Sequence, residues 1–131
     1  MRLSLVLDTT AVVAYARGNL MVGELLDELR DEDNLFGVPD VCLAQARAQG
    51  APTEGLTLLR QHDRCQVLSN PEPENLGDVA VVCGGDLVRA AVLVHAFSND
   101  AYILTTAPGD YMKLSIIDEA DVIHLTDEWP R

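Results

Sequence analysis

Strand-like hydrophobic runs recur along the whole chain. Residues 3–7 form a nearly continuous apolar run, which is typical of a strand covered on both faces of a parallel sheet. Similar short runs predict further strands over 35–38, 65–69, 101–105 and 121–125. Each run is followed by a turn or by a segment with a different hydrophobic period.

The segments between these runs carry apolar residues at helical spacing. Gly50 and the pair Gly84-Gly85 mark helix ends, and Asp86 opens the last long helix, in which we expect Leu87 on the buried face. We expect Thr53 to cap an earlier helix. The predicted helices cover residues 9–16, 22–30, 40–49, 52–61, 76–83 and 86–99, with a Pro/Glu-rich loop over 70–75.

This alternation predicts the fold class. About five strands and five to seven helices with short connections indicate a three-layer α/β/α sandwich around a mostly parallel sheet. No repeat or long linker divides the sequence. We therefore expect one domain covering residues 1–131.

Composition and charge narrow the choice of partners. The chain has 48% hydrophobic and only 5% aromatic residues, so the core is expected to be aliphatic. Its 21 acidic and nine basic residues give a net charge of −12, which disfavours broad electrostatic binding to RNA. The absence of a signal peptide or an apolar run of about 20 residues favours a cytoplasmic protein that does not enter a membrane.

Cysteine and histidine residues do not follow metal-site spacing. Three cysteines without a CxxC pattern indicate reduced thiols rather than disulfides or a zinc site. His62, His95 and His124 are widely separated, and we expect His95 to be a hydrogen-bonded helix residue. Tyr102 and Tyr111 are expected to pack near the edge of the sheet.

Asp8 ends the first predicted strand and has two possible roles. It is either the N-cap of the following helix or a ligand-binding carboxylate, because open α/β sheets bind ligands at the carboxyl ends of their strands. Thr9 and Thr10 are alternative caps, since a hydroxyl can also accept a backbone N–H hydrogen bond. This stretch alone leaves both roles for Asp8 open.

Four segments, in order along the chain, resemble the PIN domain of VapC-type toxins. They are the strand end "LDTT", the middle segment "VPDVCLAQA", the helix "DLVRAAVLVHA" and the strand and turn "AYILTTAPGDY". The resemblance implies a metal-dependent endoribonuclease, a hydrolase that is the toxin of a toxin-antitoxin pair and is often a dimer. It also implies three or four carboxylates that hold Mg²⁺ or Mn²⁺ at the carboxyl edge of the sheet.

The resemblance places two family acids on acids of this chain and two on uncharged residues. Asp8 and Asp86 match the first acid and the acid that opens the late helix, whereas Gln45 and Ala107 fall where the other two acids are expected. Asp110, three residues beyond Ala107, is a candidate substitute metal ligand. The resemblance therefore implies a degenerate site.

The missing charges bear directly on metal affinity and catalysis. A pair of unit charges at ~4 Å is worth about 4 kcal/mol at an effective dielectric constant of ~20, and a divalent ion gains roughly twice that from each carboxylate. The loss of two acids thus predicts weak or no nuclease activity. Thr9, Arg89 and Thr105 are candidate substrate contacts, although the spacing of Arg89 from Asp86 favours a structural ion pair between these two residues.

Three hypotheses follow. The first is a PIN-like protein with a binding or regulatory role, with an antitoxin or another protein as its partner and with self-association into a homodimer. The second is an active Mg²⁺- or Mn²⁺-dependent ribonuclease toxin. The third is a receiver-like signalling domain, a class that we expect to resemble this chain in the order of its strands. Such domains have a pair of acids after the first strand and a Lys-Pro after the last. Here Asp8 has no acidic neighbour, and the chain has no Lys-Pro.

Overall fold

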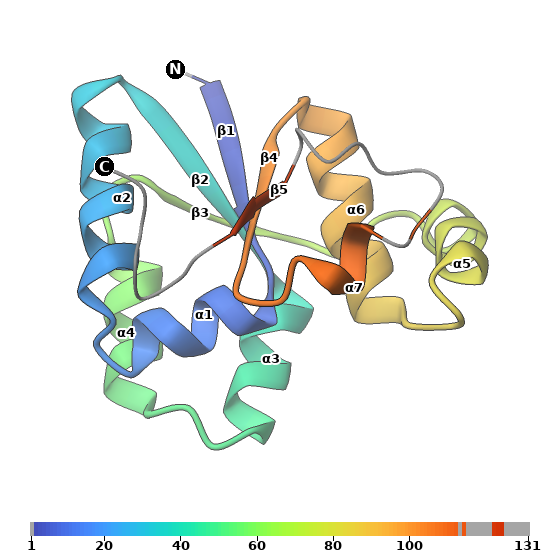
Figure 1. Cartoon of the computed structure of the whole chain (residues 1–131), viewed down its shortest axis with the longest axis horizontal. Helices are drawn as coiled ribbons and strands as arrows, with labels where there is room; N and C mark the ends of the chain where they lie inside the picture. The colour runs from blue at the N-terminus through green and yellow to red at the C-terminus, as the bar shows by residue number, and fades with distance from the viewer. Residues whose placement is uncertain (1, 113, 115–121, 125–131) are drawn as a thin grey trace.

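The computed structural model describes residues 2–112, 114 and 122–124. Five parallel strands form one sheet in the order β3-β2-β1-β4-β5, so β1 lies at its centre (Figure 1). The strands are β1 (Arg2–Leu7), β2 (Asn34–Pro39), β3 (Cys65–Leu68), β4 (Tyr102–Thr105) and β5 (Val122–His124).

Seven helices connect these strands within the described residues. They are α1 (Thr9–Ala16), α2 (Leu20–Asp31), α3 (Asp40–Ala48), α4 (Thr53–Gln61), α5 (Pro73–Val82), α6 (Leu87–Asn99) and α7 (Gly109–Met112). Together with the parallel sheet they make the predicted α/β architecture, and this expectation is confirmed.

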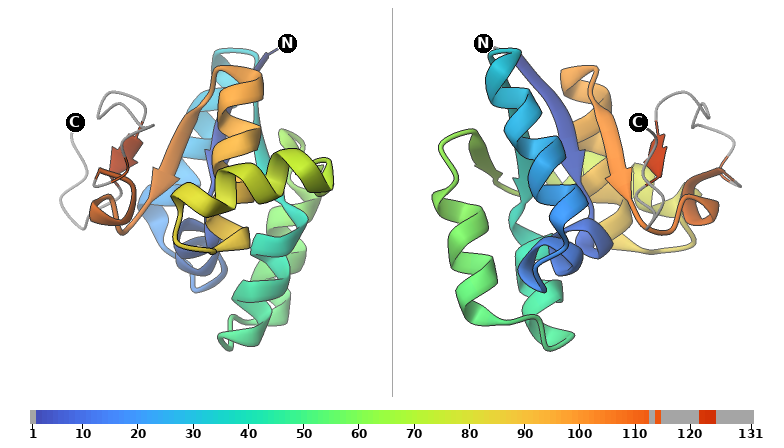
Figure 2. Two further views of the ribbon diagram at one scale, coloured as in Figure 1. Left: turned by 90° about the vertical axis from the view of Figure 1, so that its right-hand side faces the viewer. Right: turned by 60° about the vertical axis from the view of Figure 1, so that its left-hand side comes forward.

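The helices lie on both faces of the sheet. Helix α2 packs against β2, and α6 packs against β1 and β4. Figure 2 shows α6 in front of the sheet and α2 behind it. Helix α5 contacts α6 and forms an outer layer on that side.

Burial of β1 explains the continuous apolar run in the sequence. Val6 and Leu7 are fully buried because the sheet is covered on both faces. Phe36 in β2 and Leu93 in α6 are also fully buried, and the rest of the core is mainly aliphatic. Aliphatic side chains therefore form one continuous core with few aromatic residues.

The parallel register brings the ends of β1 and β4 together. Leu7 pairs with Leu104, and the backbone N–H of Asp8 donates to the Leu104 carbonyl at 3.2 Å. Helices α1 and α3 lie beyond this carboxyl edge, in the lower half of Figure 1, and α7 lies beside the edge at mid-height. Any polar side chains that follow the strands are consequently directed to one region.

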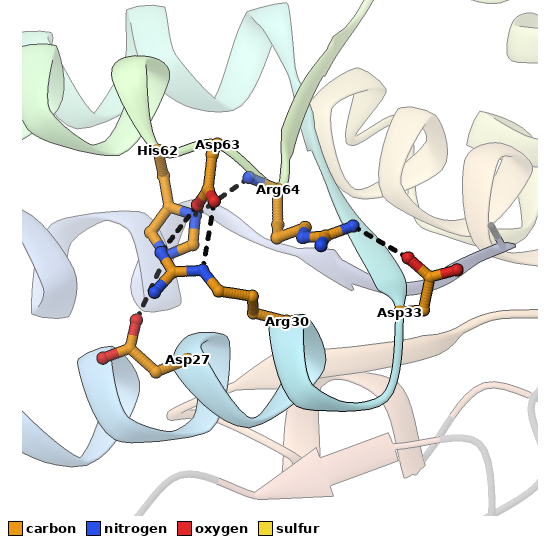
Figure 3. Close-up of polar contacts among 6 residues, drawn as sticks. All are labelled: Asp27, Arg30, Asp33, His62, Asp63 and Arg64. Atoms are coloured by element: carbon orange, nitrogen blue, oxygen red, sulfur yellow. Dashed lines mark hydrogen bonds and ion pairs between the residues drawn. The ribbon is translucent and has the colours of Figure 1, made fainter.

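A group of ion pairs joins the end of α2 to the turn between α4 and β3 (Figure 3). Arg30 donates two hydrogen bonds to the Asp63 carboxylate, at 3.1 and 2.7 Å, and these bonds lower the pKa of Asp63. The Nδ1 atom of His62 accepts the backbone N–H of Arg64 at 3.1 Å, so its Nε2 carries the hydrogen and faces Asp27 at 3.3 Å. These contacts hold the α4–β3 turn against α2.

Several local predictions about helix starts are wrong. Helix α5 begins at Pro73, inside the expected 70–75 loop, because proline at the first helical position needs no N–H partner. Thr53 is the first helical residue of α4 and makes no side-chain cap. Leu87 is 57% exposed at the start of α6, rather than buried.

The cap of α1 differs from expectation, and the expected hydrogen bonding of His95 is met at only one of its two ring nitrogens. Asp8, not Thr9 or Thr10, caps α1, because its carboxylate accepts the Ala11 N–H. The buried Nε2 atom of His95 has no hydrogen-bond partner in the described part of the chain. Burial accordingly lowers the pKa of His95, although a hydrogen bond to the Ser69 backbone partly offsets this effect.

The sheet order contradicts the receiver-like hypothesis. Receiver domains have the strand order 2-1-3-4-5, whereas this sheet has the order 3-2-1-4-5. The expectation that the two share a strand order is therefore wrong, and the topology gives that hypothesis no support.

No single helix among the described residues is both long and apolar enough to cross a membrane. Helices α5 and α6 would be long and apolar enough only if they were counted as one segment, and the two are bent by 109° relative to each other.

Candidate functional site

Asp8 is buried at the carboxyl end of the central strand and accepts three hydrogen bonds from chain donors. Its Oδ1 accepts hydrogen bonds from the Ala11 N–H at 3.0 Å and the Thr10 hydroxyl at 2.6 Å. Its Oδ2 accepts the Tyr111 hydroxyl at 2.8 Å. Only 5% of Asp8 is exposed, so these three bonds replace most of the water that a free carboxylate would bind.

Thr9 connects α1 to Gln45 of α3. Its hydroxyl donates to the Gln45 Oε1 at 2.7 Å, so the uncharged oxygen of this side chain already has a partner. Cys42 lies one turn before Gln45, is fully buried, and is hydrogen-bonded to Thr9. Burial raises the pKa of the Cys42 thiol to about 12, which keeps it neutral and unreactive.

Asp86 caps α6 and faces Arg89 of the same helix. Its Oδ1 accepts the Arg89 backbone N–H at 3.0 Å, and its Oδ2 lies 3.6 Å from the Arg89 Nη2 atom. The same Nη2 atom is 3.3 Å from the Asp110 Oδ2. The guanidinium thus lies between two carboxylates that come from α7 and from the start of α6.

Tyr111 closes the site from α7. The side chain is 2% exposed, its hydroxyl donates to Asp8, and the Arg89 guanidinium carbon lies 5.9 Å from its ring centre. Burial and the charge of Asp8 raise the pKa of Tyr111 well above its usual range. The phenol therefore remains a proton donor to Asp8.

These residues line one pocket of about 250 Å³. It brings together most of the sequence-predicted site residues from distant parts of the chain. The lining residues are Asp8, Thr9, Thr10, Gln45, Gln49, Asp86, Val88, Arg89, Val92, Asp110 and Tyr111.

Two predicted residues lie outside this lining. Thr105 is fully buried, and its Oγ1 accepts the Ala107 N–H at 3.0 Å, so it shapes the turn after β4. The Thr105 hydroxyl is also 3.2 Å from that of Thr10. Ala107 contributes only backbone to this turn.

Hydrogen bonds and ion pairs already engage the carboxylates that a divalent metal ion would need. Mg²⁺ needs oxygen ligands with free lone pairs in near-octahedral geometry. Here Asp8 accepts three hydrogen bonds, and Arg89 pairs with both Asp86 and Asp110. No group of three or more His, Cys, Asp or Glu side chains within the described residues is arranged to hold a metal.

Tyr111 and Gln49 belong to the site although they were not predicted as site residues. Gln49 lies four residues after Gln45, and this spacing places both amides on one helix face. Tyr111 follows Asp110 directly, but its bond to Asp8 spans 103 residues and leaves no local sequence signal.

Comparison with known proteins supports the fold. No protein-family model and no curated protein sequence matches the chain. The crystal structure of PAE2754 from Pyrobaculum aerophilum superposes with a TM-score of 0.67 at 16% identity, covering 95% of this chain and 90% of that one.

A second similar structure is that of VapBC2 from Rickettsia felis bound to a DNA fragment from their promoter. The TM-score is 0.71 at 12% identity, and the match covers 95% of this chain and 100% of that one. The chain therefore has a PIN-like fold, as its sequence motifs predict.

Proposed function

We propose that this chain is a PIN-like module that acts by binding another protein and cleaves RNA weakly or not at all. The observation that carries the proposal is the position of Arg89, whose guanidinium pairs with Asp86 at 3.6 Å and with Asp110 at 3.3 Å. One positive side chain is thus shared by two of the three carboxylates that line the pocket, and it offsets one of their negative charges.

The uncharged residues at two family positions support the same conclusion. Gln45 offers an oxygen that already accepts the Thr9 hydroxyl, and Ala107 offers none. Three carboxylates and one guanidinium leave the pocket with a formal charge of −2, and one of the carboxylates is tied to Tyr111. Such a pocket holds Mg²⁺ or Mn²⁺ less strongly than four free acids would.

A second pocket supports a protein-binding role. It lies between α1, α2 and α4, has a volume of about 480 Å³, and exposes Leu20 and Leu58, which are 80% and 61% accessible. The acids Glu24, Asp27 and Glu54 line the same pocket. An apolar surface beside acidic groups suits a basic amphipathic segment, in keeping with an antitoxin-type partner.

The alternative function is that of an active Mg²⁺- or Mn²⁺-dependent ribonuclease toxin. It is favoured by the convergence of Asp8, Asp86 and Asp110 on one pocket from three distant segments. In that case the Arg89 side chain would separate from Asp86 and Asp110 and would contact a phosphate of the RNA. Any metal bound there would activate a water molecule for attack on the phosphate.

RNA cleavage separates these two functions. We expect wild-type protein with Mg²⁺ or Mn²⁺ to cleave RNA no faster than the Asp8→Asn variant, because the wild-type acids are already paired. The Arg47→Gln variant, prepared identically, controls for contaminating nuclease. Metal-dependent cleavage by the wild type that is lost in Asp8→Asn would instead establish the ribonuclease.

Partner binding tests the second half of the proposal. When a basic amphipathic peptide is titrated into the chain, we expect binding that Leu58→Glu weakens and Val81→Glu does not, since Val81 is exposed on α5 and lies outside this second pocket. If both variants weakened binding equally, the second pocket would not be the binding surface. Light scattering on the isolated chain tests the proposed homodimer, which a monomer mass at all concentrations would contradict.

A further inference from the structure

We propose that Arg89 is a built-in cation of the acid pocket and that helix α7 latches it in place, so that divalent ions are kept out. This inference rests on the proposed function, because it explains why a pocket with three acids would lack metal-dependent activity. It assigns to Arg89 and Tyr111 a role that is not evident from the sequence motifs.

The Arg89 side chain is held from three directions. Its Nη2 atom lies 3.6 Å from the Asp86 Oδ2 and 3.3 Å from the Asp110 Oδ2, and its guanidinium carbon is 5.9 Å from the Tyr111 ring centre. Only 24% of the Arg89 side chain is exposed. The guanidinium is therefore part of the pocket wall rather than a freely solvated surface charge.

The cap of α6 orients the first partner. Because the Asp86 Oδ1 accepts the Arg89 backbone N–H, the other oxygen of that carboxylate is directed toward the Arg89 side chain. One residue pair thus sets both the start of α6 and the position of the positive charge. A divalent ion at Asp86 would have to displace this arginine or accept its repulsion.

Helix α7 supplies the latch through two adjacent residues. Asp110 pairs with Arg89, and Tyr111 donates its hydroxyl to the Asp8 Oδ2 at 2.8 Å. The third carboxylate is thereby occupied by the same short segment that holds the arginine. A metal ion bound by Asp8 and Asp110 would therefore compete with both contacts.

Titration of Mn²⁺ by calorimetry tests this inference without measuring activity. We expect no detectable binding to the wild type and clear binding to Arg89→Gln, which corresponds to a gain in affinity of at least tenfold. Arg47→Gln removes an exposed α3 arginine that does not line the pocket, and it should match the wild type. Equal Mn²⁺ affinity of wild type and Arg89→Gln would overturn the inference.

Arg89→Lys separates the effect of charge from that of shape. This variant retains a positive charge, so we expect it to bind Mn²⁺ no more than the wild type does. If Arg89→Lys instead bound Mn²⁺ as tightly as Arg89→Gln, the positive charge would not be what excludes the metal. If Arg89→Gln does not fold alone, Mn²⁺ is expected to restore its folding, as seen in its thermal unfolding. Failure of Mn²⁺ to do so would also contradict the inference.

The outcomes separate this inference from the proposed function. RNA cleavage by the wild type overturns the proposed function. Mn²⁺ binding by the wild type without cleavage overturns only the role of Arg89. Mn²⁺ binding that appears in Arg89→Gln, with or without cleavage, supports Arg89 as the built-in cation.

Discussion

At the residue scale, Asp8 caps a helix and lies in the wall of the pocket at the same time. It caps α1 through the Ala11 N–H, and it lines the pocket at the carboxyl end of β1. The two roles are compatible because its Oδ1 serves the cap while its Oδ2 points to Tyr111. A carboxylate that is 5% exposed needs all of these donors.

Tyr111→Phe is predicted to destabilise the fold. The substitution removes the hydroxyl that donates to Asp8, and a hydrogen bond to a charged group contributes roughly 1.5–3 kcal/mol. The free energy of unfolding, measured by urea denaturation, should fall by about that amount. Tyr102→Phe is the control because Tyr102 is 49% exposed, and it should change little. Equal effects of the two substitutions would contradict the prediction.

His95 predicts a pH dependence of stability. Burial lowers the pKa of this histidine, so the unfolded chain binds a proton more readily than the folded one. The free energy of unfolding should therefore fall as the pH drops below the ordinary histidine pKa of about 6.5. His95→Gln should reduce this loss in urea titrations at neutral and mildly acidic pH. If the free energy of unfolding of the variant depended on pH as that of the wild type does, groups other than His95 would cause the loss of stability.

At the scale of elements, hydrophobic periodicity located nearly every helix and strand, but boundaries depended on contacts. The pattern could not show that α5 begins at Pro73, since a proline suits both a loop and a first helical turn. Similarly, Leu87 follows the apolar periodicity of α6, yet it lies at the end of the helix, beyond its packed neighbours. Periodicity identifies a face, whereas burial depends on what covers it.

The crossing of α1 and α4 yields a prediction about Gly55. A Cβ atom at this position would overlap the backbone of Ala16, including its carbonyl oxygen. Gly55→Ala should therefore lower the free energy of unfolding by roughly 1–3 kcal/mol, as in other overpacked sites. Urea denaturation provides the measurement.

Gly77 supplies a matched control for Gly55→Ala. It lies within α5, where an added Cβ atom meets nothing within 4 Å. Gly77→Ala should raise the free energy of unfolding by roughly 0.5–1 kcal/mol, because alanine is the better helix former. Loss of stability in both variants would mean that the close contact between helices is not the cause.

At the scale of the whole molecule, the net charge of −12 predicts stabilisation by salt. Repulsion among the acids disfavours the compact state, and salt shortens the screening length from ~30 Å at 0.01 M to ~10 Å at 0.1 M. The midpoint of thermal unfolding should rise over this range of NaCl. KCl at the same ionic strength should act alike, whereas a midpoint that falls with either salt would contradict the prediction.

The sequence by itself determined the α/β class, the central strand that ends at Asp8, and the segments that carry Gln45, Asp86 and Asp110. These features follow from local periodicity and from the common edge at which parallel strands end. Only the tertiary structure decided the order of the strands, the bond from Tyr111 to Asp8, and the pairing of Arg89 with Asp110. These depend on side-chain contacts between segments far apart in the chain, for which local patterns carry no signal.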